Sequence, residues 1–216
     1  MSKGIQYKVT EYLKDKVKRH FIRKYGLEAI GLLHGVGQSL DKPVWLFYGT
    51  LLGAYRENGF IRHDFDIDLC MYAADFDYAF QRAIYDRGFK LLRAFYAVDP
   101  SQPEERRVTE VTLKYRHVYI DIFLRFREEG HTYGYVWDDG DVERNVWLAR
   151  IDDFELDGFV ESDFLGIMVL VPTNTREFLA AKYGDDFMTP RPGWQPQRRE
   201  HVPLEQCHGE VVGGWI

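Results

Sequence analysis

Long hydrophobic runs are absent from this sequence of 216 residues. No window approaches the roughly 18 to 20 uncharged apolar residues that a transmembrane helix needs. The first 26 residues alternate charged and apolar side chains, whereas a secretory signal would carry an unbroken apolar stretch. We therefore expect a protein of the cytoplasm.

Cysteine is also scarce, since Cys70 and Cys207 are the only two in the chain. Two cysteines are too few for a disulfide framework or for a cysteine-rich zinc site. Cys70 lies within an apolar run. We expect two reduced thiols without a chemical role.

Basic residues are outnumbered, and the net charge is −6. The charges are unevenly distributed along the chain. Residues 1–25 contain eight Lys or Arg against Glu11 and Asp15, a net charge of +6, so the remaining chain carries −12. An acidic body without a broad basic groove argues against a nucleic-acid partner.

The basic segment is predicted to be helical. Val9, Leu13, Val17 and Phe21 recur every four positions, which is typical of an amphipathic helix with a basic outer face, within a helical segment over 1–40. One interpretation is a solvated helix packed on the acidic body. The other is attraction to an anionic substrate or, as peripheral contact, to an anionic membrane surface.

The rest of the chain indicates one mixed α/β domain over 1–216. A hydrophobic content of 45% suffices for a sizeable core, and no repeat or low-complexity linker divides the sequence. Hydrophobic periodicity and turn residues predict strands over 44–49, 65–71, 89–96, 108–115, 118–126, 150–158 and 164–172, and helices over 50–59, 76–88 and 176–184. Asp75 is the predicted N-cap of the second of these helices. The Pro- and Gly-rich tail over 190–216 is expected to be irregular.

Three aspartates, Asp64, Asp66 and Asp68, occupy alternate positions at a predicted strand. Alternate side chains of a strand share a face, so Asp66 and Asp68 would project side by side about 6 to 7 Å apart. Two like charges held that close repel each other unless a cation, a proton or a basic partner lies between them. The pair therefore indicates a hard-cation site for Mg²⁺ or Mn²⁺.

Two further features complete this candidate site. Asp121 lies between hydrophobic residues of a predicted core strand, where an acid is rarely found unless it is paired or coordinates a cation. Gly49 and Thr50 follow an apolar strand and open a helix, which suits the approach of a phosphate. Together these residues indicate a metal and phosphate site.

The same residues carry a family resemblance. The segments "GTLLGAYRENGFIRHDFDIDL", "YIDIF" and "VPTNTREFLAAKYGDDFMTPRP" resemble the LicD family in sequence and in order, from Phe47 to Pro192. The resemblance implies the nucleotidyltransferase fold of the DNA polymerase β superfamily, a mixed sheet with flanking helices. It also implies transfer of a substituted phosphate or phosphonate, such as phosphocholine, phosphoribitol or aminoethylphosphonate, from a CDP-linked donor to a hydroxyl of a glycan or lipid-linked glycan.

The resemblance also implies roles for individual residues. It makes Asp66, Asp68 and Asp121 the catalytic and metal-binding carboxylates. The substrate-binding residues would be Gly49, Thr50, Arg56 and Lys182, with the Arg56 guanidinium as a clamp for the donor diphosphate. The sequence departs from the family pattern at Arg62, where a proline is usual, and at Phe65, between two of the aspartates.

In the expected mechanism, Asp66 and Asp68 hold Mg²⁺ on the donor diphosphate, while Asp121 binds a second metal or accepts the proton of the attacking hydroxyl. The setting would be bacterial polysaccharide or capsule biosynthesis on the cytoplasmic side of the membrane. Two alternatives remain: a nucleotidyltransferase that modifies a small hydroxylated substrate, and a non-catalytic binding protein of the same fold.

Overall fold

A computed structural model describes residues 15–99, 102–128, 131–137, 146–150, 156–191, 202–203 and 208–213. The described chain is a mixed α/β structure in which a sheet forms the core, as the sequence predicted. Its helices are η1 (Ile22–Gly26), α2 (Leu27–Ser39), α3 (Tyr48–Glu57), η2 (Ala73–Asp75), α4 (Tyr78–Asp86) and α5 (Thr175–Tyr183). Its strands are β1 (Val44–Leu46), β2 (Ile67–Tyr72), β3 (Phe89–Asp99), β4 (Gln102–Tyr115), β5 (Val118–Glu128), β6 (His131–Trp137), β7 (Val146–Arg150), β8 (Phe159–Phe164), β9 (Ile167–Pro172), β10 (Val202–Pro203) and β11 (His208–Gly213).

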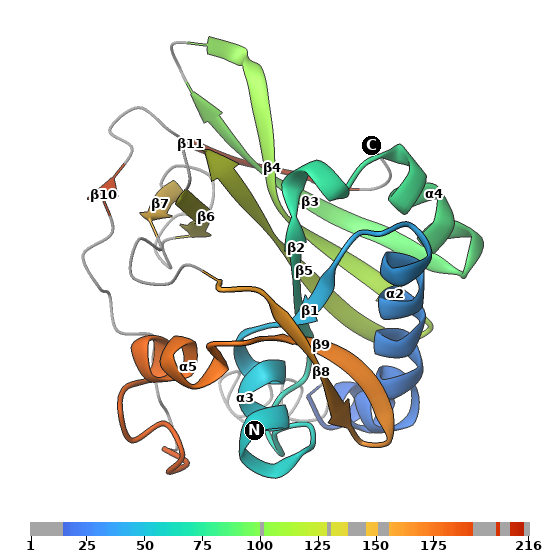
Figure 1. Ribbon diagram of the computed structural model, residues 1–216. Helices are drawn as coiled ribbons and strands as arrows, with labels where there is room; N and C mark the ends of the chain where they lie inside the picture. The colour runs from blue at the N-terminus through green and yellow to red at the C-terminus, as the bar shows by residue number, and fades with distance from the viewer. Residues whose placement is uncertain are drawn as a thin grey trace, which may run out of the picture.

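The middle of the sheet is formed by β5, β2, β1 and β9. β2 runs parallel to β5 and antiparallel to β1, and β1 runs parallel to β9. β4 joins β5 as an antiparallel neighbour, and β3 and β11 follow it. In Figure 1, α2 and α4 lie to one side of the central strands, and α3 and α5 lie to the other.

Apolar side chains fix the central strands. Trp45, Phe47, Leu69 and Ile120 are all at most 1% exposed. Fully burying a large apolar side chain contributes about 1.5 to 3 kcal/mol, so these residues hold β1, β2 and β5 in one register. Helix α2 adds Ile30 and Leu33, one turn apart, on its sheet-facing side.

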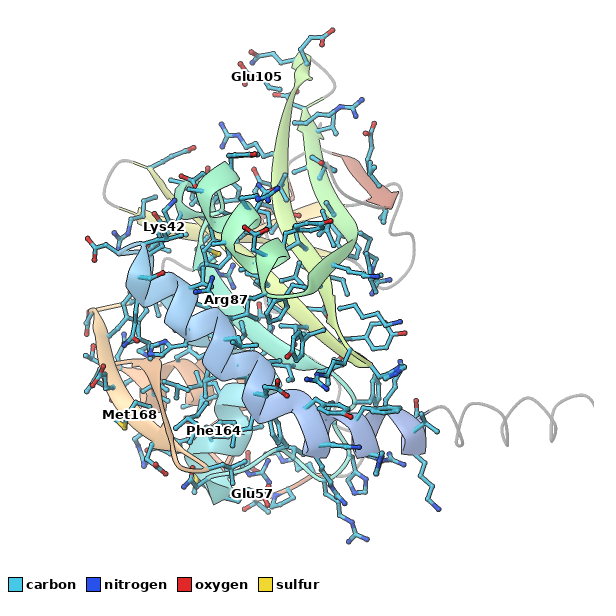
Figure 2. The ribbon with its side chains drawn as sticks, turned by 90° about the vertical axis from the view of Figure 1, so that its right-hand side faces the viewer. Lys42, Glu57, Arg87, Glu105, Phe164 and Met168 are labelled. Atoms are coloured by element: carbon cyan, nitrogen blue, oxygen red, sulfur yellow. The ribbon has the colours of Figure 1, made fainter. Side chains whose placement is uncertain are left out.

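The predicted hairpin of two alternating strands is confirmed. β4 and β5 pair antiparallel from Tyr115 and Val118 onward, and Arg116 in the turn has a φ of 52°. β3 and β4 form a ribbon that extends beyond the body of the molecule, with Glu105 near its far end (Figure 2).

Several details differ from the sequence-based predictions. β2 begins at Ile67, so Asp66 precedes the strand on which it was expected. The strand expected over 164–172 is interrupted by the turn between β8 and β9, and that expected over 150–158 falls mostly on residues outside the described ranges. The strand expected over 44–49 ends at Leu46, and α3 already begins at Tyr48. Asp77, not Asp75, caps α4, because its carboxylate accepts a hydrogen bond from the Phe80 N–H while residues 73–75 form a separate 3₁₀ turn.

A further difference concerns the tail predicted to be irregular over 190–216. Residues 208–213 form β11, which pairs with β3 from His208 and Val98 to Gly213 and Arg93. Composition missed this strand because the pairing partner lies more than a hundred residues earlier, and edge pairing is a tertiary effect.

The basic N-terminal segment is helical where the structure describes it. Residues 15–21 are α-helical and lead through the π-helical turn η1 into α2, while residues 1–14 lie outside the described part. Phe21 stacks on His117 of the β4–β5 turn, with 4.3 Å between ring centroids, which fixes this helix against the hairpin. None of the described helices is long and apolar enough to cross a membrane.

Candidate functional site

Two of the predicted carboxylates meet in the middle of the sheet. Asp68 of β2 and Asp121 of β5 are direct partners in the parallel register. Their strand neighbours Ile67, Leu69 and Ile120 are buried in the core, so the two aspartates project from the opposite face. β2 and β5, the two strands predicted to carry metal ligands, therefore each contribute one aspartate, and the two side chains lie next to each other on the same face of the sheet.

The Asp68 segment is tied to the start of α3 by two hydrogen bonds. Gly49 donates its N–H to Oδ2 of Asp68 at 2.9 Å, and the Asp68 N–H donates to Oγ1 of Thr50, also at 2.9 Å. A carboxylate at the first turn of a helix satisfies an otherwise unpaired N–H and is favoured by the helix dipole. Gly49 and Thr50 thus hold the start of β2 against α3.

Gly49 is required by the close approach of two acids. A Cβ at this position would lie 3.0 Å from Oδ2 of Asp68 and 3.1 Å from Oδ2 of Asp64. Both distances are shorter than ordinary van der Waals contact. Glycine at position 49 therefore lets Asp64 and Asp68 converge on the same end of α3.

Asp121 is held by a neighbouring strand. Thr112 of β4 donates its hydroxyl to Oδ1 of Asp121 at 2.6 Å, and Arg93 of β3 donates its Nε–H to the same hydroxyl at 3.0 Å. Thr112 and Asp121 are direct partners in the β4–β5 register. The chain from Arg93 through Thr112 orients the Asp121 carboxyl.

The acids of the site raise one another's pKa. Burial raises the pKa of Asp68 well above its usual range, and the charges of Asp66 and Asp121 add to the effect. Burial likewise raises the pKa of Asp121 to about 6 and that of Asp64 to about 6, each with a contribution from Asp66. Asp66 also has a raised pKa, caused by burial and opposed by the Lys18 ammonium. Asp64, Asp66, Asp68 and Asp121 are called the acid cluster below.

Sequence reasoning missed two charged neighbours of the acid cluster. Glu110 of β4 is partly buried, and burial together with the Asp121 charge raises its pKa to about 8. Lys18 of the N-terminal helix lowers the pKa of Asp66 and of Asp121 by its charge. Glu110 had a signal in the sequence, as an acid within the alternating strand over 108–115, whereas Lys18 had none beyond its charge.

Cationic and aromatic side chains gather around Tyr48, the first residue of α3. The buried Arg125 donates to the Tyr48 hydroxyl at 3.2 Å, and the Lys182 ammonium lies 4.3 Å from the centre of the Tyr48 ring. Tyr183 next to Lys182 has a raised pKa, caused by burial and by the Asp68 charge. Lys182, a predicted substrate-binding residue, therefore lies on the Tyr48 side of the acid cluster.

Arg56, the other predicted cationic clamp, acts on Asp64. It lies in the last turn of α3, and its charge lowers the pKa of that carboxyl. His63, directly before Asp64, does not join the acid cluster but lines a separate hollow with Arg62.

The donor set fits a hard divalent cation, which takes oxygen ligands and would relieve the mutual repulsion of the acids. The side chains do not form a preassembled site, because no three His, Cys, Asp or Glu of the described ranges converge as metal ligands. Asp68 and Asp121 instead accept hydrogen bonds from Gly49 and Thr112.

The chain is similar to a family of transferases. The family model described as LicD/FKTN/FKRP, nucleotidyltransferase domain, matches residues 42–174, more than half of the chain. This range contains the acid cluster, Gly49, Thr50 and Arg56.

Individual relatives agree with this match. Ribitol-5-phosphate transferase FKTN of Mus musculus is 28% identical over 188 residues, which cover 85% of this chain and 38% of the relative. Ribitol 5-phosphate transferase FKRP of Homo sapiens is 26% identical over 166 residues, covering 69% and 29%. The uncharacterized protein T07A5.1 of Caenorhabditis elegans is 31% identical over 171 residues, covering 74% and 42%. The chain spans less than half the length of these relatives. It belongs to the LicD family.

Proposed function

We propose that this chain is a metal-dependent transferase that moves a substituted phosphate or phosphonate from a CDP-activated donor to a hydroxyl of a glycan. The observation that carries the proposal is the register pairing of Asp68 with Asp121 inside the acid cluster. The names of two relatives, both ribitol 5-phosphate transferases, support the same reaction class. The proposal includes the nucleotidyltransferase fold and action at the cytoplasmic face of a membrane.

Asp66 and Asp68 would hold Mg²⁺ or Mn²⁺ in this proposal, with Asp121 as a third ligand or as a base. The cation would offset the charge of the donor diphosphate and of the cytidine monophosphate that leaves. Gly49 has no side chain, so the carboxylates of Asp64 and Asp68 lie together at the start of α3. A cation held by these acids would bring the donor phosphates to this end of the helix.

Asp121 is suited to accept the proton of the attacking hydroxyl. Burial raises its pKa to about 6, which is closer to neutrality than that of an exposed aspartate. The Thr112 hydroxyl fixes the orientation of this carboxyl through Oδ1. Lys182 lies over the Tyr48 ring, where its charge suits further phosphate oxygens, and the buried Arg125 holds the Tyr48 hydroxyl.

A binding experiment tests the proposal. The melting temperature of the full chain is measured with CDP-ribitol, CDP-choline and ATP, each with and without Mg²⁺. We expect a Mg²⁺-dependent increase with a CDP-linked compound and its loss in Asp68→Asn, in which the amide oxygen can still accept from Gly49.

Asp86→Asn is the matched control. Asp86 is a surface acid on α4 that pairs with Arg82, and the same change there should leave the increase intact. An increase with ATP but with no cytidine compound would contradict the CDP donor and favour nucleotidyl transfer. Equal responses of both variants would remove Asp68 from the site.

A further inference from the structure

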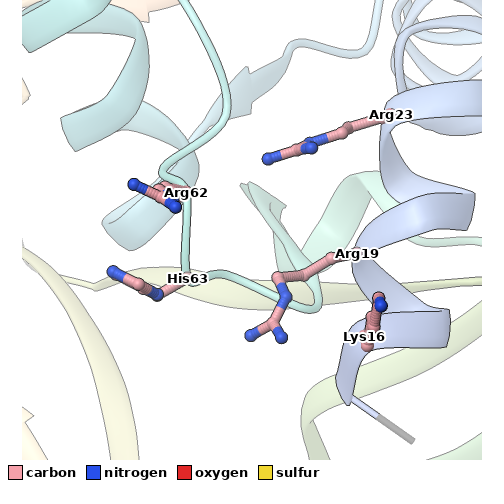
Figure 3. Close-up of a pocket in the computed structure, with 5 residues that line it drawn as sticks. All are labelled: Lys16, Arg19, Arg23, Arg62 and His63. Atoms are coloured by element: carbon pink, nitrogen blue, oxygen red, sulfur yellow. The ribbon is translucent and has the colours of Figure 1, made fainter. Parts of the chain in front are cut away.

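A hollow of about 460 Å³ lies beside the acid cluster and is lined by basic side chains. Its lining residues are Lys16, Arg19, Arg23, Arg62 and His63, and we call it the basic pocket. Figure 3 shows Lys16, Arg19 and Arg23 on the N-terminal helix at one side and Arg62 and His63 on a loop at the other. Two segments distant in sequence therefore supply the cations.

Local structure holds these two segments opposite each other. Lys16, Arg19 and Arg23 are spaced by three and four residues, which places them on one helix face. The loop that carries Arg62 and His63 is fixed at its start, where the Phe60 ring packs edge-to-face on Phe164 at 5.2 Å between centroids. The pocket is thus part of the folded structure.

Within the described part of the chain, the cations of the pocket have no acidic partner. Lys16, Arg19, Arg23 and Arg62 form no ion pair with any residue in the described ranges, and all but Arg19 are exposed. Other surface arginines are paired, as Arg106 is with Glu210 and Arg116 with Glu28. Four like charges around one hollow repel each other, so an anion from solution would bind favourably.

The pocket is next to the acid cluster in both chain and space. His63 directly precedes Asp64. Lys18 lies on the same helix turn as Lys16 and Arg19, and its charge lowers the pKa of Asp66 and of Asp121. A molecule of sugar size that is held in the basic pocket can therefore extend to the acids.

We propose that the basic pocket binds an anionic group of the acceptor, with a sugar phosphate as the best match. Guanidinium groups hold phosphate oxygens through paired hydrogen bonds, and two or more phosphate charges suit four cations. This inference rests on the proposed function, in which the donor diphosphate is bound at the start of α3 by the acid cluster and its cation. The basic pocket is then left for a second anionic group, which belongs to the acceptor.

Calorimetric titration of the full chain with glucose 6-phosphate, inorganic phosphate and uncharged glucose tests this inference. We expect both phosphates to bind and glucose not to bind. Arg23→Gln should weaken glucose 6-phosphate binding at least tenfold. Lys24→Gln is the matched control, since Lys24 is the next residue on the helix, lies over the Tyr25 ring and does not line the pocket. Equal weakening by both variants, or no binding of glucose 6-phosphate to the unmodified protein, would overturn the proposal.

Two further arms identify the source of the anion. Saturating CDP with Mg²⁺ should leave glucose 6-phosphate binding unchanged, and competition between them would assign the pocket to the donor instead. Sedimentation with vesicles of phosphatidylcholine and phosphatidylglycerol should show no selective loss in Arg23→Gln, and such a loss without sugar phosphate binding would make this face a membrane contact. Asp68→Asn should still bind glucose 6-phosphate. If the unmodified protein binds glucose 6-phosphate but shows no transferase activity, the proposed function is wrong and the anion site stands.

Discussion

Thr112 and Asp121 face each other across β4 and β5, and the Thr112 hydroxyl donates to Oδ1 of Asp121 at 2.6 Å. The contact lowers the pKa of Asp121, opposing the effect of burial. It links the acid cluster to a strand that carries none of the predicted site residues.

Thr112→Val removes this hydrogen bond at nearly constant volume. We expect transferase activity to fall roughly 10- to 100-fold, as for the loss of a group that orients a ligand or base. Because the hydroxyl lowers the pKa of Asp121, the acidic limb of the pH–rate profile should also move to higher pH. The measurement is kcat and KM as a function of pH.

Thr109→Val provides the comparison on the same strand. Thr109 is equally buried, but its hydroxyl donates to the carbonyl of Phe95, away from Asp121. It should lower stability without moving the pH profile. A Thr112→Val profile that coincides with that of the unmodified protein would show that Thr112 is only structural.

Asp121 of the acid cluster and its neighbour Glu110 should make the metal-free protein less stable as the pH rises. Burial raises the pKa of Glu110 from 4.5 to about 8, and that of Asp121 from 3.8 to about 6. A carboxyl with a higher pKa in the folded than in the unfolded chain binds more protons when folded, so the free energy of unfolding falls between those two pH values. We expect a loss of a few kcal/mol from about pH 4 to pH 8 in EDTA, measured by urea unfolding.

Glu110→Gln should flatten the upper part of this pH dependence, between about pH 6 and pH 8, because the amide does not ionise. Mg²⁺ should restore stability at pH 8 if the acids bind it. A free energy of unfolding that rises from pH 6 to pH 8 in EDTA would contradict the assigned pKa shifts.

Two glycine substitutions should act in opposite directions. A Cβ at Gly53 of α3 would lie 2.4 Å from the carbonyl oxygen of Gly59, so Gly53→Ala forces the loop after α3 to move. We expect a loss of about 1 to 3 kcal/mol in unfolding free energy. Gly35 of α2 is exposed and would meet nothing within 4 Å, so Gly35→Ala should stabilise by up to about 1 kcal/mol. Equal effects in thermal unfolding would show that the α3 loop accommodates the methyl group.

The sequence predicted the parts of the fold and site that depend on local pattern. Alternation identified the β4–β5 hairpin, and a buried-looking acid identified Asp121. The same pattern did not reveal that Asp68 and Asp121 are register partners, because parallel pairing is set by contacts between distant segments.

The missed residues share a physical reason. Glu110, Thr112 and Lys18 reach the acid cluster only after β4 and the N-terminal helix have packed beside it. Asp77 caps α4 in place of Asp75 because the intervening residues close a 3₁₀ turn of their own. Local propensity describes neither effect.

The π-helical turn over Ile22–Gly26 determines the direction in which the basic pocket faces. A π-turn accommodates about one extra residue per turn, and one residue corresponds to roughly 100° of rotation about a helix axis. Residues 15–21 are therefore out of phase with α2, whose apolar face stays on the sheet. Deleting one residue within this turn would restore a regular helix, rotating Lys18 away from the acids and Lys16 and Arg19 away from the basic pocket. The bulge couples the orientation of an entire cationic face to a single position of the backbone.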